Sequence, residues 1–354
     1  MMVDKNANQL IESVVRSWEP GTRIRASVAL TPDASTRRYY RIDLVRQTGT
    51  PTSVIAMVFH GVAAAEVGSG EKVNADQAYV ELTHFLRHHH VPVPELYHDA
   101  RDVGVLLIED LGSRHLSDVV LGKSSGQSVA THLRYFESAI REIVRLQRIP
   151  SKPNFFPYTR TFNRDLYFRE MTEFRDYVMP RPSMSTDEVS ALEHCFSALA
   201  EELDRAPRVL AHRDFHSWNL LIDPSEKVRI IDFQDALQAT RTYDVVALLN
   251  DRDIDGALGH DACEQLFDFF ERELSLSESL VGEYRRVLLQ RDLKVAGRFM
   301  KLSKERGLRQ YEVWVPGTLR RIERTLIALQ GEARASSAFG ELRRVISGHL
   351  QLNK

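Results

Sequence analysis

Two stretches of the chain decide how its fold is interpreted: Ala211-His212-Arg213-Asp214-Phe215-His216-Ser217-Trp218-Asn219-Leu220-Leu221-Ile222-Asp223 and Val228-Arg229-Ile230-Ile231-Asp232-Phe233-Gln234-Asp235. The runs 220–222 and 228–231 are short and apolar, as is typical of β-strands, and the polar residues 223–227 between them indicate a turn. If the resulting hairpin is regular, Asn219 and Asp232 stand opposite each other at its open end.

This hairpin end has the residue types of a magnesium site. Asn219 and Asp232 would bring an amide oxygen and a carboxylate together, and magnesium prefers such oxygen ligands. Asp214 lies five residues before Asn219 on the loop that leads in, where it would accept a proton from an attacking hydroxyl. The order and spacing, HRD-x4-N followed by D-F-x, are those of the catalytic loop and metal aspartate of kinases. Phosphoryl transfer depends mainly on positioning and charge neutralisation, which these residues supply.

Two other interpretations of the same residues are open. Asp and Asn are common in turns, so the carboxylates would then only satisfy the ends of a hairpin. The H-x-D-x-H run also allows a metallo-hydrolase, with ligands His212, Asp214, His216, Asp232 and Asp235. That alternative leaves Asn219 and the strand-rich N-terminal part unexplained, so we favour phosphoryl transfer.

Residues around the motif receive supporting roles. We interpret His212 as an orienting residue packed under the loop. Asp235 would steady the metal loop or contact substrate, and a structural hydrogen-bonding role is equally open. Asp244 begins an apolar helix and is interpreted as its N-cap. Glu170 and Arg175 lie on an aromatic-rich helix, for which a solvated or core-covering face is favoured over a sugar pocket.

The composition is that of an ordinary globular chain and excludes several classes of protein. Its 354 residues suggest two domains. Lys plus Arg number 47 and Asp plus Glu 49, and the net charge of −2 argues against a nucleic-acid partner. The two cysteines cannot form a disulfide scaffold. Without a signal-peptide core or an apolar run of about 20 residues, we expect a cytoplasmic protein with no membrane partner; its oligomeric state is unknown.

The order of the expected elements indicates an α+β fold. Helices are expected over residues 10–18 and 78–86, and strands over 24–30, 39–45, 54–59 and 104–109. After Glu109 the chain is mostly helical, interrupted once by short strands between 209 and 232. Runs of strands followed by runs of helices favour α+β over a doubly wound parallel sheet. We therefore predict a boundary that separates residues 1–109 from residues 110–354.

Taken together, these segments resemble the aminoglycoside phosphotransferase and choline kinase group. Within that group, Asp33-Ala34-Ser35-Thr36-Arg37-Arg38-Tyr39-Tyr40-Arg41 resembles the DAS-x-RRY-x-R segment of bacterial anomeric kinases of N-acetylmuramate and N-acetylglucosamine. Residues 107–112 resemble their hinge, residues 232–236 and 243–251 their metal segment and the helix after it, and residues 289–297 their late QR-x-LKV-x-G helix. The matches run from Asp33 to Tyr311, which is most of the chain.

The resemblance implies a two-lobed protein-kinase-like fold, with a small strand-rich N-terminal nucleotide-binding lobe and a larger helical C-terminal catalytic lobe. It implies that ATP and Mg²⁺ are used to phosphorylate the anomeric (C1) hydroxyl of a small amino sugar in cell-wall recycling. Asp214 would be the catalytic base, and Asn219 and Asp232 would hold Mg²⁺. The nucleotide would be contacted by Ser35, Thr36, Arg37 and Arg38, and by the backbone of Glu109 and Leu111 at the hinge.

The expected third strand departs from the kinase pattern. A kinase usually carries a lysine there to hold the phosphates, but residues 54–60 contain none. We expect Arg37, Arg38 or Arg41 to supply the positive charge. Two functional alternatives are a phosphotransferase for an aminoglycoside, choline or another small alcohol, and a non-catalytic kinase-like binding module. The intact Asp214, Asn219 and Asp232 argue against the module.

Overall fold

The computed structural model describes residues 2–30, 37–46, 49, 51–59, 75–122, 129–179, 182, 184–332 and 337–350. The chain forms two compact units. The first consists of Met1–Val67, Lys72–Leu116 and Trp218–Asp235, and the second of Gly68–Glu71, Ser117–Ser217 and Ala236–Lys354. The HRD-x4-N motif is therefore divided: the loop with Asp214 belongs to the second unit, and the hairpin with Asn219 and Asp232 belongs to the first.

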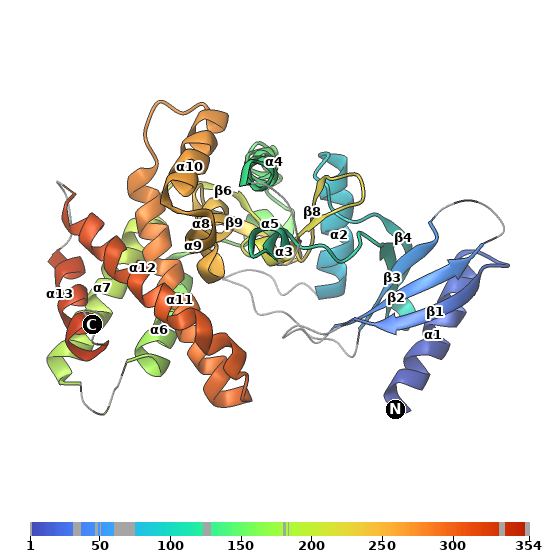
Figure 1. The fold of residues 1–354 in the computed structure, drawn as a ribbon, viewed down its shortest axis with the longest axis horizontal. Coiled ribbons are helices and arrows are strands. Elements are labelled where there is room, and N and C mark those ends of the chain that lie inside the picture. The colour runs from blue at the N-terminus through green and yellow to red at the C-terminus, as the bar shows by residue number, and fades with distance from the viewer. Residues whose placement is uncertain are drawn as a thin grey trace. The chain divides into compact units, whose positions relative to one another are not determined.

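The first unit contains an antiparallel sheet, which is five-stranded among the described residues (Figure 1). In spatial order its strands are β1 (Arg23–Ala29), β2 (Arg38–Val45), β3 (Ser53–Val58), β5 (Val105–Glu109) and β4 (Leu96–Ala100). Helix α2 (Ala75–His88) and a 3₁₀ turn (Arg101–Val103) lie between β3 and β5 in sequence. Because β3 is the central strand, every residue from Val54 to Val58 is buried.

Helix α1 (Met2–Trp18) covers one face of this sheet (Figure 1). Four of its apolar residues, at helical spacing, are at most 4% exposed: Ala7, Ile11, Val14 and Val15. They pack against alternate residues of the strands, namely Tyr40, Ile42, Leu44, Val54, Ala56, Val58, Val105 and Leu107. The period of two along each strand and the helical period of α1 thus build one shared core.

The second unit is mostly helical (Figure 1). Its helices are α3 (Leu116–Val120), α4 (Val129–Gln147), α5 (Phe156–Thr159), α6 (Arg164–Tyr177), α7 (Thr186–Asp204), α8 (Tyr243–Asn250), α9 (Ile254–Leu258), α10 (His260–Leu274), α11 (Val281–Arg306), α12 (Val315–Gln330) and α13 (Ser337–Leu350), where α3 begins at the last residue of the first unit. Strands β6 (Arg208–Ala211) and β9 (Leu237–Thr240) pair antiparallel. Strand β6 leads directly into the loop that carries Asp214.

Helices α6 and α11 approach each other closely at Gly297. A Cβ atom added to Gly297 would lie 2.4 Å from the backbone carbon of Glu173 and 2.4 Å from the backbone nitrogen of Phe174. Backbone atoms cannot move aside as a flexible side chain can, so only glycine permits this contact. The close approach holds the polar face of α11 against α6.

The predicted α+β fold class is confirmed, with strands in the N-terminal part and helices in the remainder. Two strands, β4 and β9, were not predicted. Strand β4 lies at the sheet edge, and its pairing with β5 is irregular between Leu96 and His98. An edge strand with an irregular register does not show the regular alternation of apolar and polar residues by which strands are predicted. The lobe boundary between Glu109 and Asp110 stays a prediction. In the described part of the chain, no helix is both long and apolar enough to cross a membrane.

Replacing Gly297 by alanine tests the contact between α6 and α11. Alanine favours a helix by about 1 kcal/mol over glycine, but the clash with the α6 backbone costs about 1–3 kcal/mol or more. We therefore expect Gly297→Ala to lower the free energy of unfolding, measured by urea denaturation. Gly348→Ala in α13 is the matched control, because a Cβ there meets no atom within 4 Å. Equal effects of the two substitutions would contradict the close packing.

Candidate active site

The hairpin of strands β7 (Leu220–Ile222) and β8 (Val228–Ile230) is present in the first unit, but its register differs from the prediction by one residue. Leu220 pairs with Ile230, and the Ile231 N–H donates to the Asn219 carbonyl at 3.0 Å. The expected alignment of Asn219 with Asp232 is therefore wrong. Asp232 comes one residue after the position opposite Asn219, so the two residues still lie at the same end of the hairpin.

The turn of this hairpin explains the shift. The Asp223 N–H donates to the Lys227 carbonyl at 3.0 Å, which leaves three residues between them rather than an even number. Glu226, the last of the three, has a φ of 60°, as a three-residue hairpin connection requires. The Asp223 carboxylate accepts the N–H groups of Ser225 and Lys227 at 2.8 and 3.1 Å, so the turn is fixed by a side chain.

Asp232 is oriented to present its carboxylate to solvent. Its φ of 63° turns the chain out of the strand, and its side chain is exposed. The next residue, Phe233, is 1% exposed and stacks on Tyr79 of α2 with ring centroids 4.9 Å apart. Asn219 is 9% exposed at the same hairpin end. A carboxylate and an amide oxygen at one end of a hairpin fit a magnesium ion, which takes few protein ligands and keeps several waters.

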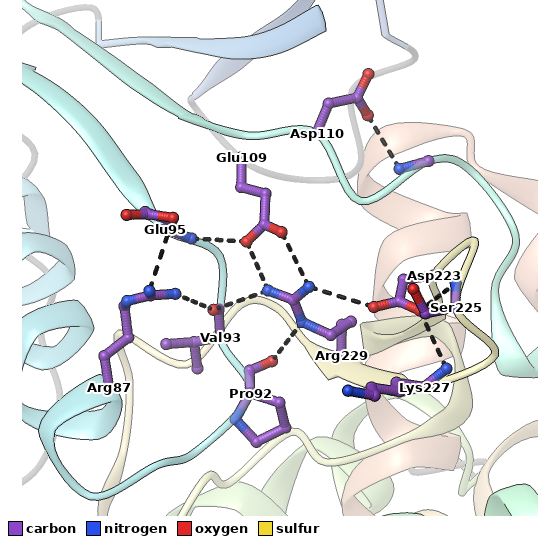
Figure 2. A network of polar contacts seen from close by, with 11 residues as sticks. Arg87, Pro92, Val93, Glu95, Glu109, Asp110, Asp223, Ser225, Lys227 and Arg229 are labelled. Carbon is purple, nitrogen blue, oxygen red and sulfur yellow. Dashed lines mark hydrogen bonds and ion pairs between the residues drawn. The ribbon is translucent and has the colours of Figure 1, made fainter. Parts of the chain in front are cut away.

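Arg229 of β8 fixes the end of strand β5, where the hinge is expected (Figure 2). Its guanidinium contacts both oxygens of Glu109 at 3.0 and 2.6 Å, and Asp223 at 3.3 Å. It also donates to the carbonyls of Pro92 and Val93 at 3.3 and 3.2 Å. The Glu109 N–H is used as well, by the Glu95 carbonyl at 2.8 Å. These contacts engage the carboxylate and the N–H of Glu109 but not its carbonyl.

A second arginine, Arg41 of β2, fixes the residues that follow. Its guanidinium binds both oxygens of Asp110 at 2.9 and 3.0 Å and the Gly112 carbonyl at 2.8 Å. Asp110 also accepts the Ser53 hydroxyl at 2.8 Å and the Gly112 N–H at 3.0 Å. Leu111 is held between these contacts and is 4% exposed. Because Arg41 already neutralises Asp110, the structure does not favour it as the substitute for the missing strand lysine.

Arg37 has more suitable surroundings for that role. It is 9% exposed and lies directly before β2. Burial raises the pKa of Asp76, and the nearby Arg37 charge partly opposes this shift. Burial is the main cause of the raised pKa of Tyr79; the Asp232 charge raises it further, and the Arg37 charge lowers it. Arg37 and Asp232 therefore both lie near Tyr79 on α2. Arg38 lies at the start of β2, whereas Ser35 and Thr36 lie outside the described residues.

In the second unit, Asp244 of α8 anchors the loop that carries Asp214. Its carboxylate accepts the backbone N–H groups of His212 at 2.7 Å and Arg213 at 3.0 Å. The N-cap of α8 is Thr242, so the interpretation of Asp244 as an N-cap is wrong. His212 is 2% exposed, and its ring packs edge-to-face on Phe215 with centroids 5.5 Å apart. Two backbone donors, one buried and one partly buried, therefore depend on one carboxylate.

Asp214 lies among positively charged side chains. Its Oδ1 is 3.9 Å from Nη2 of Arg291, and the Arg291 guanidinium also donates to the Arg213 carbonyl at 3.3 Å. Although burial disfavours its charged form, the charges of Lys294, Arg213 and Arg291 hold the pKa of Asp214 well below its usual range. Surrounding positive charge disfavours a metal cation on Asp214 and suits an ionised carboxylate that meets a hydroxyl.

Glu170 of α6 connects these cations, and the sequence did not reveal this. Its carboxylate, 7% exposed, contacts Arg213 and Lys294 at 3.2 Å each and Gln290 at 3.4 Å. Although burial opposes ionisation, Lys294 and Arg213 lower the pKa of Glu170. The expected solvated or core-covering role of Glu170 does not describe this ion-pair centre. Arg175 instead pairs with Asp176 and Glu193.

The remaining candidate residues are His216 and Asp235. Burial lowers the pKa of His216 to about 4, which makes it neutral at neutral pH, and its Nε2 lies 3.9 Å from Asp251. Asp235 is half-buried in the first unit. Among the described residues, no group of three or more His, Cys, Asp or Glu side chains is arranged to hold a metal ion. The predicted pair of Asn219 and Asp232 offers a different donor set.

Replacing Lys294 by methionine tests the charge balance at Asp214. A general base acts when deprotonated, so rate is lost as the pH falls through its pKa. Removing one cation raises the pKa of Asp214, and we expect the acidic limb of the kcat–pH profile to move to higher pH. Lys294→Arg should keep the wild-type limb, and the neutral pair Lys294→Met/Glu170→Gln should restore much of it. An unmoved limb in folded Lys294→Met would contradict this electrostatic role.

Comparison with known proteins places the chain in a family. Residues 28–274 match the model of the phosphotransferase enzyme family. N-acetylmuramate/N-acetylglucosamine kinase of Neisseria meningitidis serogroup B is 28% identical over 66% of this chain and 71% of that protein. The Pseudomonas aeruginosa protein of the same name is 26% identical over 89% of this chain and 87% of that protein.

A solved structure extends the likeness to the fold. Choline kinase LicA from Streptococcus pneumoniae is 12% identical, with a TM-score of 0.57, and the match covers 97% of this chain and 98% of that chain. This likeness confirms the predicted two-lobed protein-kinase-like fold. Because the family model matches well over half of its residues, the chain belongs to the phosphotransferase enzyme family and is an enzyme that transfers a phosphoryl group to a hydroxyl acceptor.

Proposed function

We propose that this enzyme uses ATP and Mg²⁺ to phosphorylate the anomeric (C1) hydroxyl of an amino sugar, N-acetylmuramate or N-acetylglucosamine, in cell-wall sugar recycling. The observation that carries the chemistry is Asp214, an aspartate at the catalytic position whose carboxylate is kept ionised by three cations. The relatives named for these two sugars, matched over much of their length, support the choice of acceptor.

In this reaction Asp214 orients the acceptor hydroxyl by accepting its hydrogen bond. The hydroxyl oxygen forms a bond to the γ-phosphorus of ATP as the bond to the β–γ bridging oxygen breaks, and ADP leaves. The proton passes to Asp214. A carboxylate with a lowered pKa is a weak base, so positioning is its main contribution, as expected for a loose transition state. An anomeric hydroxyl is more acidic than an ordinary alcohol, which suits a weak base.

Asn219 and Asp232 would hold Mg²⁺, which neutralises charge on the phosphates when bound. The backbone carbonyl of Glu109 and the N–H of Leu111 would meet adenine, on a segment that Arg229 and Arg41 hold in place. Ser35 and Thr36 would cover the phosphates. His212 and Asp235 would support the catalytic loop and the metal segment.

The charges around Asp214 also affect which acceptor molecules can bind near it. Lys294, Arg213 and Arg291 place three positive charges near it, which the carboxylates of Glu170 and Asp251 compensate in part. A cationic acceptor such as choline or an aminoglycoside would meet repulsion from this cluster. A neutral or anionic sugar would not.

An acceptor screen tests the proposal. N-acetylmuramate, N-acetylglucosamine, other hexoses, choline and an aminoglycoside would each be incubated with ATP and Mg²⁺, and phosphorus NMR would locate the phosphate in the product. We expect transfer to the anomeric oxygen of an N-acetylated amino sugar. We expect Asp214→Asn to lower kcat about 10²- to 10⁴-fold while the protein stays folded. Transfer to a different carbon, or unchanged kcat in Asp214→Asn, would overturn the proposal.

A second set of variants tests the substitute for the strand lysine. We expect Arg37→Ala to raise the KM for ATP at least about 10-fold, because a charge-assisted hydrogen bond to phosphate is lost. Arg38→Ala should have a smaller effect. Arg25→Ala in β1 is the matched control, since its pair with Asp43 is solvent-exposed. If the KM for ATP is the same in Arg37→Ala and Arg25→Ala, Arg37 does not hold the phosphates.

A further inference from the structure

Gln234 is the third residue of the D-F-Q segment, directly after the proposed metal ligand Asp232 and the buried Phe233. It is 7% exposed. A buried glutamine needs partners for both ends of its amide, because a buried polar atom without a hydrogen bond loses its hydration with nothing to replace it. Its surroundings therefore indicate what the residue does.

One end of the amide holds Asp232. Nε2 of Gln234 donates to Oδ1 of Asp232 at 2.8 Å. An ionised carboxylate only accepts hydrogen bonds, so the nitrogen of the amide must face Asp232 and the oxygen must face away. This bond restricts the rotation of the Asp232 carboxylate, which is otherwise exposed. Its other oxygen, Oδ2, is left for a cation.

The other end of the amide has no hydrogen-bond partner among the described residues. Oε1 of Gln234 is buried and accepts no hydrogen bond within the described part of the chain. Magnesium keeps several of its waters when it binds to a protein, and these waters are strong hydrogen-bond donors. Groups behind the direct ligands commonly orient a metal site in this way. A buried acceptor beside the metal carboxylate therefore matches a cation with its waters.

We propose that Gln234 is a positioning residue of the cation site: its Nε2 fixes the Asp232 carboxylate, and its Oε1 accepts a hydrogen bond from a water bound to the cation. The proposal rests on the proposed function, because it takes Asp232 to be a ligand of that cation. The amide thus supplies both a donor and an acceptor, which neither methionine nor glutamate can supply together.

Direct binding of Mn²⁺ in the presence of the non-hydrolysable ATP analogue adenylyl imidodiphosphate tests this. Free Mn²⁺ would be measured by electron paramagnetic resonance for the full-length protein. We expect Gln234→Met, which keeps the side-chain volume, to raise the Kd for Mn²⁺ about 10-fold. Gln234→Glu should also weaken binding, because it loses the donor and places a second carboxylate against Asp232.

The matched control is Gln147→Met in α4. Gln147 also donates through Nε2, to the Arg241 carbonyl at 2.7 Å, and its Oε1 is likewise buried without a partner in the described residues. The acceptor of this bond is a backbone carbonyl and not a carboxylate, so we expect the Gln147→Met variant to bind Mn²⁺ with the wild-type Kd. Thermal melting of both variants would show whether each is folded.

Asp232→Asn separates the failure of this proposal from that of the proposed function. If Asp232→Asn loses Mn²⁺ binding while Gln234→Met binds like the wild type, Gln234 has a structural role only and the proposal is overturned, whereas Asp232 keeps its role. If Asp232→Asn also binds like the wild type, the metal role of Asp232 falls and both are overturned. A weaker affinity in Gln234→Met alongside a normal Gln147→Met supports the proposal.

Discussion

The loop that carries Asp214, the proposed catalytic base, depends most on ion pairs to the buried Glu170 carboxylate. Arg213 lies on the loop and Lys294 on α11, and both contact this one side chain of α6. Removing one member of a buried ion pair leaves an uncompensated charge, which is strongly destabilising. The same cations also act on Asp214 and lower its pKa. The contact that holds the loop in place therefore also influences the charge of Asp214, the proposed catalytic carboxylate.

The first unit uses arginines in a comparable way. Arg229 joins the β7–β8 hairpin to Glu109 (Figure 2). Arg41 joins β2 to Asp110. A guanidinium offers five donors in a rigid plane, so one side chain can hold a carboxylate and backbone carbonyls together. The segment expected to meet adenine is thereby fixed from both sides. These arginine charges are paired with carboxylates inside the chain, whose net charge is balanced at −2.

The sequence was most informative where partners are close along the chain. The α+β class, the hairpin and the Asp214, Asn219 and Asp232 motif follow from local periodicity and spacing. The register failed by one residue because Glu226 adopts a positive φ in a three-residue turn. Glu170 and Asp244 were misjudged because their partners lie more than thirty residues away, on elements whose packing has no local signal. The QR-x-LKV-x-G segment lies on α11, the helix whose Lys294 and Gln290 contact Glu170. The function of this helix as the partner of Glu170 is seen only in these contacts and not in the sequence.

The proposed role of Asp214 requires an ionised carboxylate whose charge its cationic neighbours maintain. The most direct test is a carbon-13 NMR titration of the Asp214 carboxyl carbon in the folded protein, assigned by the loss of its signal in Asp214→Asn. An ordinary aspartate has a pKa of about 3.9 and is close to half protonated at pH 4. We predict that Asp214 stays ionised at that pH. A titration midpoint at or above the ordinary value would contradict the account.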